Sequence, residues 1–340
     1  MRKLLVAIVI LVLLIAGVAW TAYQRVTTPY RGFTAEEVFV ELPPGSGVRT
    51  IANRLADAGV VPDALSFRLA ARLAGADRRL QAGEYRFAEP ASPQQVVGRI
   101  ARGDIYTRTV TFPEGLTIRE MGRVFELAGL GPASAFEEAA KNTGLAASFD
   151  PDVPSLEGYL FPDTYPFPRT VDATVVVKAM ATRFVTAFDA ALRADAERLG
   201  LTLREATTLA SLVEKETAVA SERPLVAAVF HNRLKIGMPL QCDPTVIYAL
   251  MRANRWNGNL RRDDLQFDSP YNTYRYRGLP PGPIASPGRA SLEAVVRPAE
   301  VSYLYFVSRN DGSHVFATTL AEHNRNVQEW QIRYFRGRSR

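Results

Sequence analysis

The chain has 340 residues, of which 47 % are hydrophobic and 22 % are charged, and its formal net charge is +6 at pH 7. These values are typical of a folded protein of two or three domains and exclude a disordered one. With Cys242 as the only cysteine and three histidines, an internal disulfide and a cysteine-based metal cluster are excluded, so we expect no metal and no cofactor. Apart from the terminal residues 336–340, the chain has no Lys/Arg run of the length that nucleic-acid footprints usually show. We expect no nucleic-acid partner and a solvated, disordered basic tail at 337–340.

The first predicted element is a membrane-spanning helix over residues 4–23. These 20 residues carry no charge and would span about 30 Å as a helix, the thickness of a bilayer core. The positive residues 2–3 precede the span, which favours a cytoplasmic N-terminus. The alternative is a cleaved signal peptide with Gly17 and Ala19 as its small residues, although the apolar stretch is longer than a usual signal core. We therefore expect residues 1–25 to form a cytoplasmic tip and an uncleaved anchor, with the rest of the chain outside the cytoplasm.

A polar stalk is predicted at 26–37, and a strand, a turn and a helix follow at 40–59. The same pattern returns 70 residues later without a gap, at 110–129. The recurring positions are Val40, Pro43, Gly45, Arg49, Ala58 and Gly59, which match Val110, Pro113, Gly115, Arg119, Ala128 and Gly129. The pattern predicts a duplicated supersecondary unit, and the alternative is chance similarity between two common pieces.

The remaining elements are mostly helical. A strand at 82–87 and a helix at 93–102 lie between the two copies. Residues 255–290 are rich in Gly, Pro, Asn and Tyr and are predicted to be irregular. Further helices are predicted at 172–198, 203–219, 224–234, 241–250 and 320–334, and a hairpin of two strands at 302–308 and 314–318. The sum is an α+β fold dominated by helices.

The helix at 203–219 carries a glutamate on its apolar face. Leu209, Leu212, Val213 and Glu216 fall at i, i+3, i+4 and i+7, which is one face of a helix. Glu214 lies about 200° away around the axis, on the polar face. A carboxyl against apolar surface loses hydration and its pKa rises, which is the state that a general acid needs at neutral pH. The alternative is a helix-end glutamate whose stem reaches back to water.

Three other segments combine polar and aromatic side chains in a way that suits a glycan: residues 157–165, 241–246 and 270–288. Each has a structural alternative, namely a plug for the core, an N-cap at Asp243 for the next helix, and an ordered surface loop. Cys242 has no base partner in the pattern, so we assign it no nucleophilic role. The candidate binding residues are Glu157, Gln241, Asp243, Thr245, Tyr271 and Asn272.

These motifs, in this order, resemble those of the YceG-like endolytic murein transglycosylases, the MltG family. The resemblance covers nearly all of the chain and is carried by the anchor and by the motifs at 82–87, 157–165, 210–217, 232–234, 241–248, 271–274 and 278–284. It implies a small LysM-like subdomain at 38–105. It also implies a mainly helical, lytic-transglycosylase-like catalytic domain with a small antiparallel sheet at 106–336. The family's catalytic acid falls on Glu216, the second glutamate of its motif.

The resemblance also implies a reaction. Glu216 would protonate the glycosidic oxygen between N-acetylmuramic acid and N-acetylglucosamine within nascent glycan strands. As a carboxylate it would then take the proton of the C6 hydroxyl, which leaves a 1,6-anhydro end and terminates or trims the growing strand. Because the nucleophile is intramolecular, the second carboxylate that ordinary hydrolysis needs is not required. One rival is a muramidase-type hydrolase with Asp243 or Asp163 as that second carboxylate, and another is a non-catalytic binder of cell wall.

The implied location is the bacterial inner (cytoplasmic) membrane, with a single pass, a cytoplasmic N-terminus and a periplasmic catalytic domain. The implied partners are peptidoglycan glycan strands, the membrane through residues 4–23, and peptidoglycan synthases of the penicillin-binding class.

Overall fold

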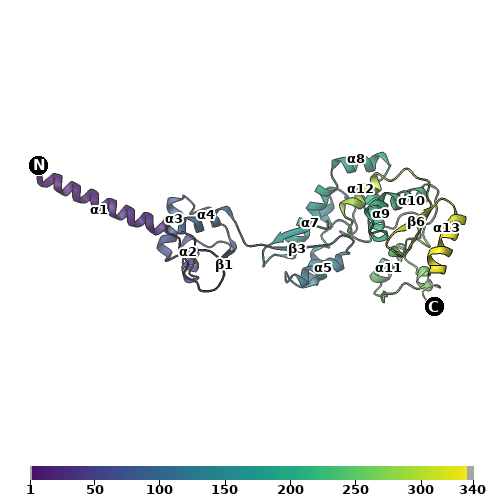
Figure 1. Cartoon of the computed structure of the whole chain (residues 1–340), viewed down its shortest axis with the longest axis horizontal. Helices are drawn as coiled ribbons and strands as arrows, with labels where there is room; N and C mark the ends of the chain where they lie inside the picture. Colours follow the sequence, from purple (N-terminus) through teal and green to yellow (C-terminus); the bar gives the residue numbers. More distant parts are fainter. Residues whose placement is uncertain (1, 335–340) are drawn as a thin grey trace. The chain divides into compact units, whose positions relative to one another are not determined.

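The computed structural model describes residues 2–334, and the predicted basic tail at 337–340 lies outside them (Figure 1). The chain divides into two compact units. Unit 1 comprises Met1–Arg108 with Pro166–Thr170, and unit 2 comprises Thr109–Tyr165 with Val171–Arg340. Helices dominate both units, and each sheet among the described residues has two strands. The predicted α+β class is therefore confirmed.

The N-terminal helix α1 (Arg2–Thr27) extends beyond the predicted span. Its length and hydropathy place a candidate membrane span at Ile8–Thr27, four residues later than predicted. Leu13 and Val18 are 66 % and 68 % exposed, as expected for side chains that would face lipid. A signal sequence near the N-terminus can meet the same criteria of length and hydropathy, so the topology stays a prediction.

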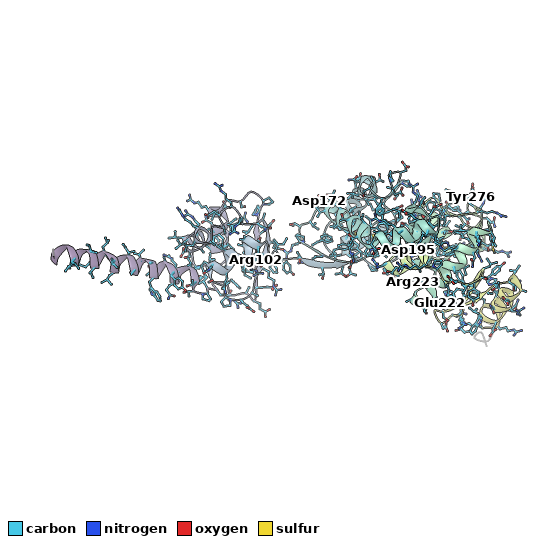
Figure 2. The ribbon with its side chains drawn as sticks, turned by 90° about the horizontal axis from the view of Figure 1, so that it is seen from above. Arg102, Asp172, Asp195, Glu222, Arg223 and Tyr276 are labelled. Atoms are coloured by element: carbon cyan, nitrogen blue, oxygen red, sulfur yellow. The ribbon has the colours of Figure 1, made fainter. Side chains whose placement is uncertain are left out.

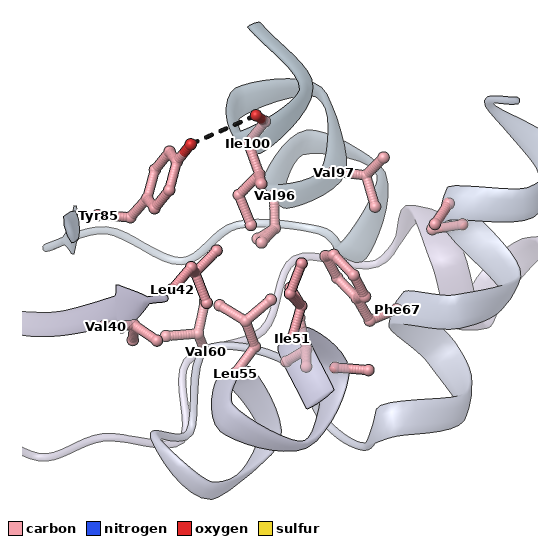
Figure 3. Packing of buried hydrophobic residues seen from close by; sticks show 14 of the residues in the cluster. Val40, Leu42, Ile51, Leu55, Val60, Phe67, Tyr85, Val96, Val97 and Ile100 are labelled. Carbon is pink, nitrogen blue, oxygen red and sulfur yellow. Dashed lines mark hydrogen bonds between the residues drawn. The ribbon is translucent and has the colours of Figure 1, made fainter. Parts of the chain in front are cut away.

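Unit 1 is built on the antiparallel pair β1 (Val38–Leu42) and β2 (Gly83–Phe87), in which Val40 lies opposite Tyr85. Its helices are α2 (Val48–Asp57), α3 (Ala64–Leu73) and α4 (Pro93–Arg102). Figure 3 shows Leu55, Phe67 and Ile100 meeting in its buried core. The Tyr85 ring is buried there, and its hydroxyl donates to the carbonyl oxygens of Gln81 (2.9 Å) and Ile100 (3.4 Å).

Residues 26–37, predicted as a stalk, belong to unit 1 and are hydrogen-bonded to its other segments. Tyr30 forms an antiparallel bridge with Ala91, and the Gly32 amide donates to the Gly59 carbonyl at 2.8 Å. These bonds join the segment after α1 to the rest of the unit.

The duplicated strand–turn–helix predicted from the 70-residue repeat is present. Helix α5 (Ile118–Leu127) begins and ends 70 residues after α2, and β3 (Arg108–Thr111) precedes it as β1 precedes α2. Gly45 and Gly115 occupy the same turn with φ of 78° and 75°, a left-handed conformation that favours glycine. The correspondence extends beyond the sequence pattern, because a helix, a pairing strand and a further helix follow in each copy. In the second copy these are α6 (Ala133–Ala139), β4 (Thr164–Phe167) and α7 (Ala173–Ala187).

The rest of unit 2 corrects several predicted boundaries. The predicted helix at 172–198 is two helices, because Asp189 caps the second and accepts hydrogen bonds from the amides of Ala191 and Leu192 at 3.1 Å. A helix also follows the irregular segment, where none was predicted. The elements after α7 are α8 (Ala190–Arg198), α9 (Leu203–Glu216), α10 (Arg223–Lys235), α11 (Asp243–Arg252), α12 (Arg289–Val296), β5 (Tyr305–Ser308), β6 (His314–Ala317) and α13 (Leu320–Val327). Short 3-10 turns lie at Thr143–Ala146, Ala220–Glu222 and Arg262–Gln266, and a π-helical turn lies at Gln328–Arg333.

Gly158 lies against the proline-rich loop of unit 2. Its φ is 82°, and a Cβ there would lie 2.3 Å from Cβ of Pro283. We expect Gly158→Ala to lower the free energy of unfolding by about 2–4 kcal/mol, because it adds left-handed strain and an overlap with a rigid ring. Gly200→Ala is the control, since Gly200 has a φ of 71° with nothing within 4 Å, and it should lose only about 1–2 kcal/mol. Equal losses in urea unfolding would contradict the packing argument.

Candidate active site

Glu216 is the last residue of α9 and lines a cavity of about 370 Å³. The helix stops there because Thr217 is extended, with φ −140° and ψ 132°. The other walls come from α10, from the segment leading into α11, from the loop of Tyr274, from the hairpin β5–β6 and from α13. The polar residues that line the cavity with Glu216 include Arg233, Gln241, Asp243, Tyr274, His314 and His323.

The surroundings of Glu216 favour its protonated form. Loss of hydration on burial raises the pKa of its carboxyl to about 7. The Cys242 thiol donates a hydrogen bond that opposes this rise, the nearby Asp243 carboxylate adds to it, and Arg233 opposes it. A carboxyl with a pKa near 7 can both give and take a proton at neutral pH, which is what general acid–base catalysis requires.

Glu214, predicted on the polar face of α9, is covered and not open to solvent. Its side chain is 6 % exposed and forms an ion pair with Arg223 at 3.4 Å. It accepts hydrogen bonds from the Gly288 amide (3.0 Å) and the Ser291 hydroxyl (2.7 Å). The reason is α12, which was not predicted and covers this face of α9. The two glutamates therefore differ in their partners: Glu214 is neutralised by a buried cation, whereas Glu216 faces a cavity.

Cys242 acquires a role that the sequence pattern did not indicate. Its side chain is buried and its thiol donates to Glu216, while burial raises the pKa of the thiol and keeps it neutral. Thr245 is also fully buried, and its hydroxyl donates to the Cys242 carbonyl at 2.7 Å and contacts the Thr273 hydroxyl at 2.9 Å. Thr245 therefore fixes the turn that carries Cys242 and does not line the cavity, contrary to the expected glycan contact.

Gln241 and Asp243 are the two predicted binding residues that share the cavity with Glu216. Gln241 has a φ of 50°, which is uncommon for a residue other than glycine. Asp243 is not the N-cap of α11, because Cys242 occupies that position. The Asp243 carboxylate instead accepts a hydrogen bond from the Tyr274 hydroxyl at 2.5 Å.

Glu157 and Tyr271 lie together, but they line a different cavity, of about 400 Å³. Glu157 is buried, accepts hydrogen bonds from the Ile118 amide (2.9 Å) and the Tyr248 hydroxyl (3.2 Å), and burial raises its pKa to about 7. The rings of Tyr248 and Tyr271 are 5.0 Å apart. These two predicted residues are therefore neighbours of each other and not of Glu216.

Asn272 is fully buried and does not reach either cavity. Its side-chain amide donates to the carbonyls of Leu265 (3.0 Å) and Phe267 (2.8 Å), and its oxygen accepts from the Tyr274 amide (2.9 Å). The residue thus holds the loop that presents Tyr274, which corrects the expected contact with glycan.

The hairpin contributes residues that sequence reasoning missed. The His314 imidazole contacts the Glu222 carboxylate at 2.7 Å, and its amide donates to the same carboxylate at 2.9 Å. Glu222 lies in the turn before α10, next to Arg223, and both are labelled in Figure 2. The hairpin itself was predicted, but no sequence signal places it beside the end of α9.

Asp163, one of the two carboxylates proposed for the rival hydrolase, does not line the Glu216 cavity. It pairs with Arg183 at 2.7 Å, which lowers the pKa of its carboxyl. Asp243 is the one that shares the cavity with Glu216.

The chain is similar to known proteins along most of its length. A model of the YceG-like family matches residues 40–329. The endolytic murein transglycosylase of Bacillus subtilis (strain 168) is 31 % identical over 334 residues, which cover 93 % of this chain and 91 % of that protein. The endolytic murein transglycosylase of Streptococcus pneumoniae serotype 2 is 32 % identical over 358 residues, which cover 95 % of this chain and 64 % of that protein. A crystal structure of a putative YceG-like protein from Listeria monocytogenes has 31 % identity and a TM-score of 0.58, over 85 % of this chain and 98 % of that one.

Proposed function

This chain belongs to the YceG-like family, and from that premise we propose that it is an endolytic murein lytic transglycosylase whose catalytic acid is Glu216. It cleaves the β-1,4 bond between N-acetylmuramic acid and N-acetylglucosamine within nascent strands and leaves 1,6-anhydro ends. The supporting observation is the Glu216 carboxyl itself, which lines a cavity at the end of α9 and whose pKa burial raises to about 7.

In this mechanism Glu216 acts twice. Its proton passes to the glycosidic oxygen as the bond from that oxygen to C1 breaks, and the leaving sugar departs with a free 4-hydroxyl. The C6 hydroxyl oxygen then bonds to C1, and its proton returns to the Glu216 carboxylate. The Cys242 thiol stabilises that carboxylate, and Gln241 and Asp243, which flank Cys242 in the chain and line the cavity, orient the glycan. Because the nucleophile belongs to the substrate, no bound water is needed.

The rival hydrolase is retained as a second candidate because Asp243 lines the same cavity as Glu216. The two reactions are distinguished by digesting nascent glycan with the full chain and measuring the mass of the ends. We expect 1,6-anhydro ends, which are one water lighter than hydrolysed ones. Reducing ends would favour the hydrolase, and sedimentation with cell wall without cleavage would favour a binder.

The rest of the chain would bring this activity to the membrane. We propose that residues 38–105 form a LysM-like glycan-binding subdomain, which their strand–helix–helix–strand order supports. We further propose that α1 anchors the chain in the bacterial inner membrane, with the catalytic domain at 106–336 in the periplasm, close to peptidoglycan synthases.

The pH dependence of cleavage should follow Glu216. Because the protonated form is the acid, we expect kcat/KM to fall as the pH rises through about 7, the pKa that burial gives this carboxyl. Asp243→Asn should move this fall to lower pH, since the Asp243 charge also raises the pKa of Glu216. Asp163→Asn removes the same charge outside the cavity and is the control. A pH–rate profile that Asp243→Asn leaves unmoved would contradict the assignment.

A further inference from the structure

A second, basic cavity lies beside the Glu216 cavity. It has a volume of about 560 Å³ and is lined by residues of α5, of α11 and of the end of α9. Lys215 in its lining directly precedes Glu216, and Pro244 directly follows Asp243. Since consecutive Cα atoms are about 3.8 Å apart, the same two chain segments border both cavities. A group attached to a sugar beside Glu216 therefore needs only a short linker to reach the basic cavity.

The cations of this cavity have no acidic partner. Arg119, Arg123 and Lys215 form no ion pair with any carboxylate among residues 2–334. Arg119 donates to the side-chain oxygen of Asn254 at 3.1 Å, and the Lys215 ammonium donates to the Gly115 carbonyl at 3.0 Å. Both partners are neutral, and three cations against the one carboxylate in the lining, Glu120, leave a net charge of +2 to attract an anion.

The rest of the lining holds one carboxylate, whose hydrogen bonds are made within its own helix turn, and apolar side chains. Glu120, an acid in the lining, accepts hydrogen bonds from the amide and hydroxyl of Thr117 at 2.8 and 2.9 Å. Ile247, Met251 and Trp256 add apolar surface. A ligand that matches these features carries carboxylates together with small aliphatic groups, which a glycan without substituents does not.

We propose that this basic cavity binds the peptide stem of peptidoglycan, with Arg119 and Arg123 holding its carboxylates. The inference rests on the proposed function, because the stem is attached to the muramic acid of that substrate. The stem is a short peptide of alanine and dicarboxylic residues, so it supplies both the charge and the methyl groups. A guanidinium can hold a carboxylate through two parallel hydrogen bonds, which gives arginine more specificity here than lysine.

The first experiment compares two substrates for the full-length, detergent-solubilised protein: nascent glycan with its stems, and the same glycan after an amidase has removed them. We expect wild type to prefer the stem-bearing glycan by about tenfold in kcat/KM, the effect of about one charge-assisted hydrogen bond. In the double variant Arg119→Gln/Arg123→Gln this ratio should approach one, because KM for the stem-bearing glycan rises. The control Arg262→Gln/Arg333→Gln removes the same charge from exposed positions that do not line the cavity and should keep the ratio.

The second experiment measures binding without catalysis. The free stem tetrapeptide is titrated into the protein by calorimetry, with a tetrapeptide whose carboxylates are amidated as the control ligand. Vesicles containing phosphatidylglycerol test an anionic lipid headgroup as the alternative ligand. We expect wild type to bind the free peptide at least tenfold more tightly than the amidated one, and the double variant to lose this difference.

A wild-type substrate ratio near one, or a double variant that keeps the preference, would overturn the inference. So would a double variant that loses binding to the vesicles but not to the peptide. A protein that binds the peptide through these arginines yet cleaves neither glycan would contradict the proposed function and leave the stem site intact.

Discussion

Glu216→Gln is expected to lower kcat/KM for glycan cleavage by about 10²–10⁴-fold, the usual contribution of a general acid or base. Glutamine has the shape of glutamic acid, but its amide cannot give a proton to the glycosidic oxygen or take one from the C6 hydroxyl. Because one carboxyl performs both transfers, the effect should lie at the upper end of this range. The measurement is the rate at which anhydro ends appear from nascent glycan.

The same variant should remain folded. The direction in which its stability differs from wild type follows from the linkage between protonation and folding. The pKa of Glu216 is raised from 4.5 to about 7 in the folded protein, so its contribution to stability is present below pH 4.5 and is lost as the pH rises through 7. The neutral glutamine has no such loss, so Glu216→Gln should unfold at an equal or higher temperature than wild type at pH 8. The control Glu197→Gln changes an exposed residue of α8 and should alter neither the cleavage rate nor the unfolding temperature. Cleavage within tenfold of wild type would exclude Glu216 as the acid.

The helical period separates the faces of α9 that carry Glu216 and Glu214, but it does not indicate that the face carrying Glu214 is covered. Periodicity indicates which residues share one face of a helix. How many of the faces of that helix are covered depends on which other helices pack against it. The face of α9 that carries Glu214 is covered by α12, which follows a segment rich in Gly and Pro and spans only Arg289–Val296. So short a helix gives a weak periodic signal.

The binding residues show a second limit. The side chains of Tyr, Asn, Thr and Gln can bind sugars, but backbone groups compete for the same side chains. Asn272 and Thr245 are fully buried and bonded to backbone groups, and so shape the site from behind. Gln241 does line the cavity. Nothing in the residues around it in the sequence distinguishes it from Asn272 and Thr245, which do not. The repeat was more predictable, since glycines at two equivalent turns must adopt positive φ in both copies.

Glu214→Ala should lower the free energy of unfolding by about 3–5 kcal/mol, as expected when one partner of a buried ion pair is removed. The Arg223 side chain is 11 % exposed, and its Nε has no hydrogen-bond partner among the described residues even in wild type. Without Glu214 the Gly288 amide and the Ser291 hydroxyl also lose their acceptor. Glu114 lies 3.8 Å from Arg223, but its side chain is 48 % exposed, so it compensates only weakly.

Urea unfolding of Glu214→Ala, Arg223→Ala and the double variant measures this coupling. The double variant should be more stable than the sum of the two single losses predicts, because neither charge is then left buried alone. The cleavage rate per folded molecule should stay within about tenfold of wild type, since Glu214 is placed outside the proton transfers and the effects of general acids are larger than this. If Glu214→Ala instead abolished cleavage while the protein remained folded, and Glu216→Gln retained it, the two glutamates would exchange roles. The ion pair with Arg223 would then have to break during each cycle, and the rate would depend on the substitution of Arg223.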